Sequence, residues 1–124
     1  MIYLDTHAAI WLRSGVVDWI SDQYRTVVAD SELLISPIVL LETSYLHEIG
    51  RVNSPAAEIL EDLVLNAGVR ICSVPFESVI RKSMEETWTR DAFDRIIVGH
   101  ARLRQAPLLT LDEDIHRHYA LAIR

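Results

Sequence analysis

Short apolar runs alternate along the chain with segments in which apolar residues recur at helical spacing. The apolar runs predict strands at residues 1–4, 32–36, 69–74 and 108–111, and a short fifth strand at 119–123. The helical spacing predicts helices at about 8–12, 17–29, 37–50, 55–67, 76–87 and 91–105. Because strands that alternate with helices form βαβ units, the pattern predicts a three-layer α/β fold with a mainly parallel sheet.

Two of these helices carry start and stop signals. Ser36-Pro37 and Ser54-Pro55 each place a favourable N-cap residue directly before a proline at the first helical position. Gly50 and Gly68 follow the last periodic residues of the same helices, where glycine commonly ends a helix.

The composition indicates one domain that spans residues 1–124. A chain of 124 residues has the length of one domain, and 50% of its residues are hydrophobic. No apolar run approaches the roughly 20 residues that cross a bilayer, and the N-terminus lacks the features of a signal peptide. The single cysteine, Cys72, lies in an apolar run and is expected in the core. These features favour a cytoplasmic protein without membrane contact.

Two acidic residues follow predicted strands. Asp5 ends the first strand and Asp112 comes directly after the fourth. Active sites of open α/β sheets lie beyond the carboxyl ends of the strands, so the two side chains would be neighbours if these strands are adjacent. The sequence alone leaves that adjacency open, and for either acid taken alone a role as the cap of the next helix is the favoured interpretation.

Glu42 lies on an apolar face of its predicted helix. The face comprises Ile38, Leu41, Tyr45, Leu46 and Ile49, and Glu42 is four residues from both Ile38 and Leu46. An isolated buried carboxylate is costly, so Glu42 should have a partner. Glu48 falls on the opposite side of the helix and is expected to be solvated.

A further pair of acids opens the helix at 91–105. Asp91 and Asp94 are three residues apart and share one side of the first turn. Both are also compatible with a purely structural role, because negative side chains are favourable at a helix N-terminus.

The combination of these acids predicts a metal site. Four carboxylates in one cleft would raise one another's pKa values, and a divalent cation relieves that repulsion. Oxygen ligands favour hard ions such as Mg²⁺ or Mn²⁺, and the chain has no Cys and His pattern at zinc spacing. A hard cation can activate water and stabilise charge on phosphate oxygens, so the site is suited to phosphodiester hydrolysis. The predicted set is Asp5, Glu42, Asp94 and Asp112.

The net charge of −6 argues against nucleic-acid binding by bulk electrostatics. The four acids account for −4 of that charge, and a bound cation would cancel it locally. Basic residues near the later acids could then contact RNA phosphates, although each could equally be a solvated charge on a helix surface. The candidates for phosphate contacts are Arg81, Lys82, Arg90 and Arg95.

Four segments of the chain resemble the motifs of PIN domains, in the right order and over essentially the whole length. The segment 2–7 (Ile-Tyr-Leu-Asp-Thr-His) resembles their opening strand and turn, and Leu41-Glu42 resembles their internal glutamate. The segment 91–97 (Asp-Ala-Phe-Asp-Arg-Ile-Ile) is similar to an Asp-Pro-Phe-Asp-Arg motif, with Ala92 where proline is common. The segment 109–112 (Leu-Thr-Leu-Asp) resembles the strand that ends in Thr-x-Asp.

This resemblance carries several implications. The fold would have a five-stranded parallel sheet with the first strand central and next to the fourth. Asp5, Glu42, Asp94 and Asp112 would bind Mg²⁺ or Mn²⁺, with Asp91 as an accessory acid. Thr6 and Thr110 would orient ligands or water by hydrogen bonding. The protein would be an endoribonuclease toxin of the VapC type, which usually forms a homodimer and is blocked by a cognate antitoxin, often through an arginine near the acids. Asp114 also follows the fourth strand, but Asp112 has the expected register with Thr110.

Other enzyme classes fit the sequence less well, and two relatives of the favoured hypothesis stay open. Haloacid-dehalogenase-like phosphatases need a second Asp two residues after the first, where this chain has His7. Response-regulator receivers need adjacent acids after the first strand and a late lysine, and the chain has neither. The open alternatives are a PIN nuclease for RNA processing without an antitoxin, and a PIN-like interaction module without catalysis.

Overall fold

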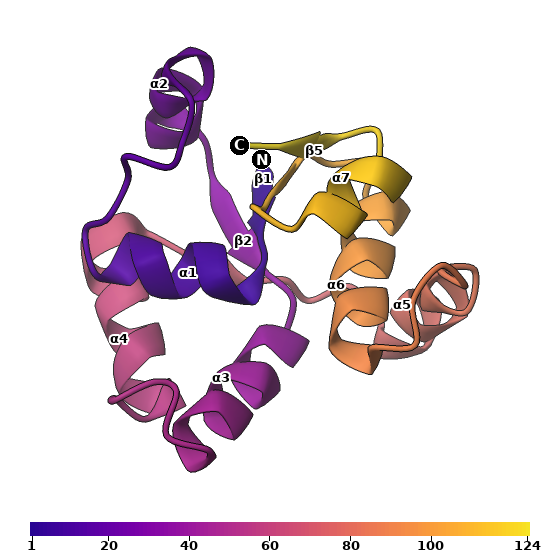
Figure 1. The fold of residues 1–124 in the computed structure, drawn as a ribbon, viewed down its shortest axis with the longest axis horizontal. Coiled ribbons are helices and arrows are strands. Elements are labelled where there is room, and N and C mark those ends of the chain that lie inside the picture. Colours follow the sequence, from indigo (N-terminus) through magenta and orange to yellow (C-terminus); the bar gives the residue numbers. More distant parts are fainter.

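Five short parallel strands form the centre of the structure, a computed structural model that describes residues 1–124 (Figure 1). The strands lie in the order β3-β2-β1-β4-β5. Tyr3 in β1 is paired with Leu34 in β2 on one side and with Leu108 in β4 on the other. The strands are β1 (Ile2–Leu4), β2 (Leu33–Ile35), β3 (Arg70–Ile71), β4 (Leu108–Leu109) and β5 (Ala122–Ile123). The predicted parallel α/β sheet, with its first strand central, is therefore confirmed.

Seven helices surround this sheet. Figure 1 shows α1 and α4 on one side of the strands and α5 and α6 on the other. None of the helices is long and apolar enough to cross a membrane. The helices are α1 (Thr6–Arg13), α2 (Asp22–Asp30), α3 (Ile38–Glu48), α4 (Ala56–Ala67), α5 (Phe76–Ser83), α6 (Ala92–Leu103) and α7 (Glu113–His118).

The core is built around β1 and β4, whose side chains are fully or almost fully buried. Cys72 is buried as predicted, and the Tyr3 hydroxyl donates a hydrogen bond to its sulfur at 2.7 Å. The α5 and α6 helices pack unusually close at Gly99, where a Cβ atom would lie 2.3 Å from Ser83 Oγ. This close contact ties α5 firmly to α6, the helix that carries Asp94.

Two predicted helix boundaries are wrong, and one helix was not predicted. The helix predicted at 17–29 begins only at Asp22, because Gly15 adopts a left-handed φ of 74° and Ser21 is extended. The helix predicted at 76–87 ends at Ser83, since the following segment turns so that the buried Glu86 carboxylate pairs with Arg102. The six-residue helix α7 was not predicted from the sequence.

The buried face of α3 also differs from the predicted one. The side chains that pack into the protein are Val39, Thr43 and Leu46. Leu41, Tyr45 and Ile49 are 59%, 47% and 48% exposed, although the periodicity placed them on the face that contacts the core. The helix is apolar on two sides, and packing against α4 and α6 covers only one of them.

Candidate active site

Asp5 follows β1 at the carboxyl end of the sheet and is almost completely buried, with 7% of its surface exposed. One of its carboxylate oxygens accepts a hydrogen bond from the Ala8 backbone N–H at 2.8 Å, which caps α1. The other oxygen accepts a hydrogen bond from the Thr110 hydroxyl. The capping interpretation is therefore correct for Asp5, and the cap also fixes the direction of its side chain.

Asp112 has the corresponding position after β4. Its Oδ1 atom accepts hydrogen bonds from the backbone N–H groups of Asp114 at 2.8 Å and Ile115 at 3.1 Å, which cap α7. The Asp112 backbone N–H donates to the Thr110 hydroxyl oxygen at 3.0 Å. Thr110 thus connects Asp5 and Asp112, which are neighbours because β1 and β4 are adjacent.

The remaining two predicted acids approach the same place from helices. Glu42 comes from α3 and Asp94 from the first turn of α6, and both are partly buried. Together with Asp5 and Asp112 they line one pocket of about 260 Å³. Its other walls are formed by Thr6, His7, Trp11, Ile97 and Leu111. Four segments that are far apart in the sequence therefore meet at one polar pocket.

Burial and mutual repulsion raise the pKa values of three of these acids. Asp94 is the clearest case: burial, and then the negative charges of Asp91 and Asp112, raise its pKa to about 7. Burial likewise raises the pKa of Glu42, and the Asp91 charge adds to this effect. Burial also raises the pKa of Asp5, although the hydrogen bonds from Thr110 and Ala8 oppose the change. The pocket therefore disfavours the full set of negative charges that its own residues carry.

Thr6 places a buried hydroxyl beside these acids. The hydroxyl is near Glu42 and lowers the pKa of that carboxyl. The geometry of this contact is not that of a hydrogen bond, so Thr6 Oγ1 has no hydrogen-bond partner in the protein. A buried polar atom without a partner is rare and costs free energy. Since Thr6 lines the pocket, its hydroxyl can satisfy this need with a water or ligand there.

Asp91 and Asp114 lie outside the pocket lining. Asp91 is exposed and caps α6, because its Oδ1 atom accepts a hydrogen bond from the Asp94 N–H at 3.1 Å. Its charge nevertheless raises the pKa values of Glu42 and Asp94. Asp114 is exposed and forms an ion pair with Arg117 at 3.0 Å. The preference for Asp112 over Asp114 therefore agrees with their positions.

None of the basic residues suggested for phosphate binding lines the acidic pocket. Arg81 and Lys82 form ion pairs along or next to α5, with Glu77 at 3.5 Å and Glu85 at 3.3 Å. Arg95 donates to the backbone carbonyls at 83 and 84, at 3.4 and 3.2 Å. Arg90 donates to the carbonyl of Thr87 at 2.8 Å.

Besides the apolar Ile97 and Leu111, sequence reasoning missed two pocket residues, His7 and Trp11. They are four residues apart on α1, directly after Asp5 and Thr6, so they share one face of the helix. That spacing could have identified them. The charge of His7 lowers the pKa values of Asp5 and Glu42.

A larger pocket of about 380 Å³ lies elsewhere, between α1, α2 and α4. Its lining is mostly apolar and includes Leu12, Ile20 and Val28 but none of the four acids. It contains no acidic or histidine side chain, whereas the acidic pocket gathers all four predicted acids and is therefore the candidate active site.

Comparison with known proteins identifies the family. The family model for the PIN domain matches residues 2–121. The chain belongs to the PIN domain family. No curated protein sequence matches this PIN domain. The family predicted from the four motifs is thus confirmed over almost the whole chain.

Solved structures share the fold of this PIN domain at low sequence identity. It resembles VapBC2 from Rickettsia felis bound to a promoter DNA fragment, with a TM-score of 0.64, 19% identity, and coverage of 100% of this chain and 98% of that one. A toxin–antitoxin complex from Klebsiella pneumoniae gives a TM-score of 0.66 at 16% identity, with 100% and 97% covered. DNA-bound VapBC from Salmonella typhimurium gives 0.59 at 20% identity, with 99% and 96% covered.

Proposed function

We propose that this PIN domain is a metal-dependent endoribonuclease and the toxin of a type II toxin–antitoxin pair. The observation that carries the proposal is the convergence of Asp5, Glu42, Asp94 and Asp112 on one pocket. The family supports a nuclease, and the toxin–antitoxin complexes among proteins of the same fold support the toxin role. Such a toxin would act on RNA in the cytoplasm, the compartment that the sequence favours.

The donor set of the pocket fits a hard divalent cation, Mg²⁺ or Mn²⁺. The four carboxylates provide only oxygen ligands, and burial and mutual repulsion raise the pKa values of three of them, which supports a site that gains from a positive charge. No three of the Asp, Glu, His or Cys side chains are close enough together to hold a metal ion without moving. The match between the pocket and the cation therefore rests on the chemistry of the carboxylate ligands. Asp91 would assist through its charge. The cation would supply activation of water and stabilisation of negative charge on the phosphate.

The chain's own residues would position the reacting groups. Thr110 holds Asp5 through its hydroxyl hydrogen and Asp112 through its hydroxyl oxygen, so one side chain orients two of the acids. The unpartnered Thr6 hydroxyl can hydrogen-bond the attacking water or a phosphate oxygen. Arg81, Lys82, Arg90 and Arg95 remain candidates for contacts with more distant phosphates of the RNA.

An antitoxin is the proposed protein partner. The pocket combines several negative charges in a partly buried space, which is complementary to a single arginine side chain from another protein. An antitoxin that inserts such an arginine would neutralise the acids and block access of RNA.

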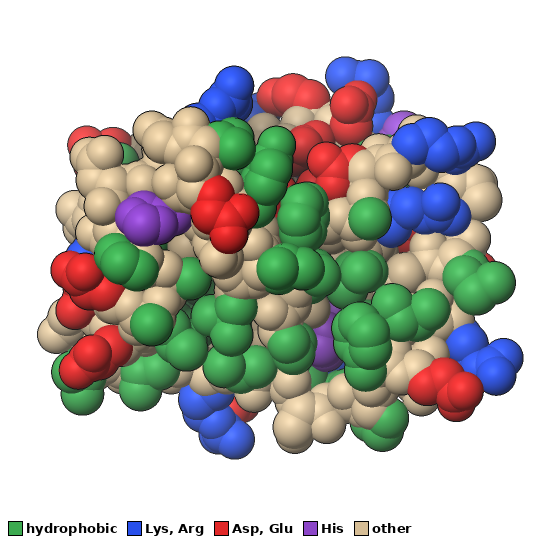
Figure 2. Space-filling model, turned by 90° about the horizontal axis from the view of Figure 1, so that it is seen from below, with side chains coloured by type: hydrophobic (Ala, Val, Ile, Leu, Met, Phe, Trp, Pro, Cys, Tyr) green, Lys and Arg blue, Asp and Glu red, His purple; other side chains and the backbone are tan.

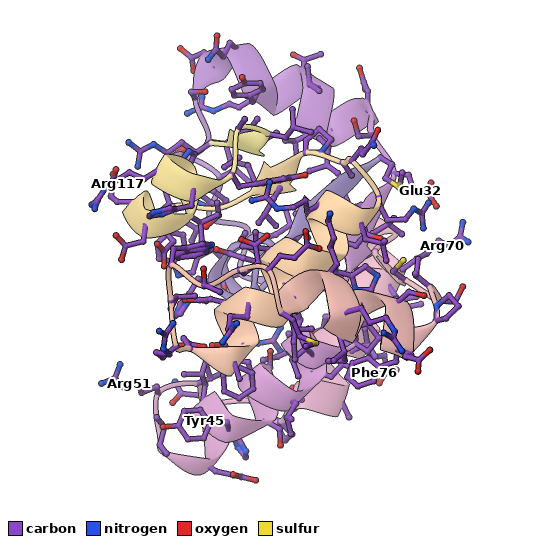
Figure 3. All side chains as sticks on the ribbon, turned by 90° about the vertical axis from the view of Figure 1, so that its right-hand side faces the viewer. Glu32, Tyr45, Arg51, Arg70, Phe76 and Arg117 are labelled. Atoms are coloured by element: carbon purple, nitrogen blue, oxygen red, sulfur yellow. The ribbon has the colours of Figure 1, made fainter.

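A second copy of the chain is the other proposed partner. Several large apolar side chains on and directly after α3 and α5 are exposed. They are Leu41 and Tyr45 on α3, Ile49 at its end, Phe76 on α5 and Met84 at its end. Figure 2 views the molecule from the side of α3 and shows hydrophobic side chains gathered across the middle of this face. Figure 3 places Tyr45 and Phe76 in the same half of the molecule. Exposed apolar surface of this kind supports the homodimer that the family resemblance implies.

Cleavage of a mixed RNA pool tests the proposed activity. The purified protein should cleave RNA with Mn²⁺ or Mg²⁺ and lose this activity with a chelator. Asp5→Asn should abolish cleavage, whereas the matched control Asp114→Asn should retain most of it, because Asp114 lies outside the pocket. Cleavage by the Asp5→Asn protein at the wild-type rate would contradict the site. A folded wild-type protein that cleaves nothing would favour the non-catalytic interaction module.

Expression in a host without an antitoxin distinguishes the toxin from an RNA-processing nuclease. The wild-type chain should arrest growth, and Asp5→Asn should relieve the arrest. Harmless expression of a protein that cleaves RNA in vitro would favour the processing nuclease.

A further inference from the structure

Trp11 forms a wall of the acidic pocket but is not among the residues that pack against the core. It is partly exposed and lies one helical turn after His7 on α1, so both side chains face the pocket. The partly buried hydrophobic residues that pack against the core include Leu12 and Trp19 but not Trp11. A large aromatic side chain is thus held at the edge of a polar pocket and contributes little to the core.

The other two tryptophans differ from Trp11 in their polar contacts. Trp19 donates its indole N–H to the carbonyl of Val16 at 2.9 Å, and Trp88 donates its own to Glu86 at 2.6 Å. The indole N–H of Trp11 has no protein acceptor. Trp11 therefore has both an apolar ring and a free hydrogen-bond donor available to a ligand.

The position of Trp11 is nevertheless well defined. The Trp19 ring contacts it edge to face, with ring centroids 5.5 Å apart and an angle of 70° between the planes. A side chain that is already held in place loses little conformational entropy when a ligand contacts it. Trp11, supported by Trp19, thus presents an ordered aromatic ring next to the acids.

The charge distribution explains why RNA would need such a surface. The pocket is lined by four carboxylates and by no arginine or lysine, and the candidate basic residues lie around α5 and α6. Apart from the proposed cation, attraction between opposite charges therefore contributes little to RNA binding at the pocket itself. Stacking of a base on an aromatic ring does not depend on the sign of the local charge.

We propose that Trp11 binds the RNA substrate by stacking against a nucleobase next to the cleaved phosphate, with its indole N–H donating to the same nucleotide. This inference rests on the proposed function. Stacking requires a base that is turned away from its neighbours in the strand, so Trp11 restricts cleavage to positions where one base can leave the stack.

An oligoribonucleotide that contains one cleavage site from the RNA pool tests this role. Trp11→Leu keeps an apolar side chain but removes the ring, and it should raise KM by roughly 5- to 100-fold. Its kcat should stay within about threefold of the wild type, because Trp11 does not touch the reacting atoms. Trp11→Phe should retain most of the affinity. Asp114→Asn changes an exposed residue outside the pocket and is the control, with KM unchanged.

Substrates that lack a single base separate stacking from a structural effect. Removal of the base beside the cleaved bond should raise KM for the wild type but have little further effect on the Trp11→Leu protein. If base removal affects both proteins equally, or if Trp11→Leu leaves KM unchanged, the inference is wrong while the nuclease function stands. If the wild type shows no metal-dependent cleavage at all, the proposed function fails and this inference fails with it.

Discussion

Replacement of Asp94 by asparagine should stabilise the metal-free protein above neutral pH. Asp94 is partly buried, and three other pocket acids and Asp91 all repel its negative charge. Its side chain forms no hydrogen bond or ion pair that the substitution would break. Asparagine has nearly the same shape but no charge, so the variant keeps the packing and loses the repulsion.

The expected size follows from the pKa of Asp94, which rises from its ordinary value of 3.8 to about 7. At 1.36 kcal/mol per pKa unit, ionised Asp94 lowers the free energy of unfolding by at most about 4 kcal/mol. Solvent screens part of this effect, since the side chain is partly exposed. The substitution also removes a favourable charge from the first turn of α6, which costs about 0.3–1 kcal/mol. We therefore expect a net stabilisation of about 2 kcal/mol.

The sign of the pH dependence follows from the same shift. A carboxyl with a raised pKa in the folded state holds its proton more tightly there than in the unfolded chain. The wild type therefore loses stability relative to Asp94→Asn as the pH rises from 3.8 towards about 7, and the difference becomes constant above that. Below pH 3.8 the two proteins should have similar stability, apart from the change in side-chain chemistry.

Thermal unfolding in the presence of chelator measures this difference. At pH 8 Asp94→Asn should raise Tm by about 8 °C, since 1 kcal/mol corresponds to about 4 °C for a domain of this size. Added Mg²⁺ or Mn²⁺ should raise the Tm of the wild type more than that of the variant. Asp114→Asn is the matched control, because that exposed acid should change the stability by less than about 0.5 kcal/mol. The electrostatic argument is wrong if Asp94→Asn is no more stable than the wild type at pH 8, or if its advantage is the same at pH 4.

Three further outcomes follow from single contacts. Thr110→Val removes the hydroxyl that contacts Asp5 and Asp112, so kcat for RNA cleavage should fall by roughly 10-fold or more with the fold retained; an unchanged kcat would exclude a positioning role. Gly99→Ala places a Cβ atom 2.3 Å from Ser83 Oγ and should destabilise the protein by about 1–3 kcal/mol in urea unfolding, which a wild-type midpoint would contradict. Leu41→Glu should convert the proposed dimer to a monomer in sedimentation experiments with little loss of stability, since Leu41 is 59% exposed; a dimer that persists would place the interface elsewhere.

The sequence predicted the elements whose signals are local. The apolar runs located all five strands, most directly β1, β2 and β4, since buried parallel strands have few polar residues. Pro55 and Gly68 marked both ends of α4. The predicted end of α5 is wrong because it depends on a non-local contact. The pairing of Glu86 with Arg102, 16 residues away, draws the chain out of a helix that the local pattern would continue.

The acids of the pocket were predicted more fully than its other walls. Glu42 was identified because a charge stood on an apolar face, although that face was partly misassigned. His7 and Trp11 carry no such conflict with their surroundings, since aromatic residues are common on amphipathic helices. The order of the strands, which makes Asp5 and Asp112 neighbours, followed only from the family resemblance.

Asp5 and Asp112 can cap helices and also serve as the proposed metal ligands, for a geometric reason. A carboxylate has two oxygens with about four acceptor sites, and a helix N-terminus occupies only some of them. In Asp112 both capping hydrogen bonds go to Oδ1, which leaves Oδ2 free of them. The cap fixes the side chain against the backbone of α7, so the free oxygen is held in place before any ligand arrives. In Asp5 the cap and the Thr110 hydroxyl occupy different oxygens and hold the whole carboxylate. Helix capping at the ends of β1 and β4 is thus the means by which this fold orients charges that repel one another.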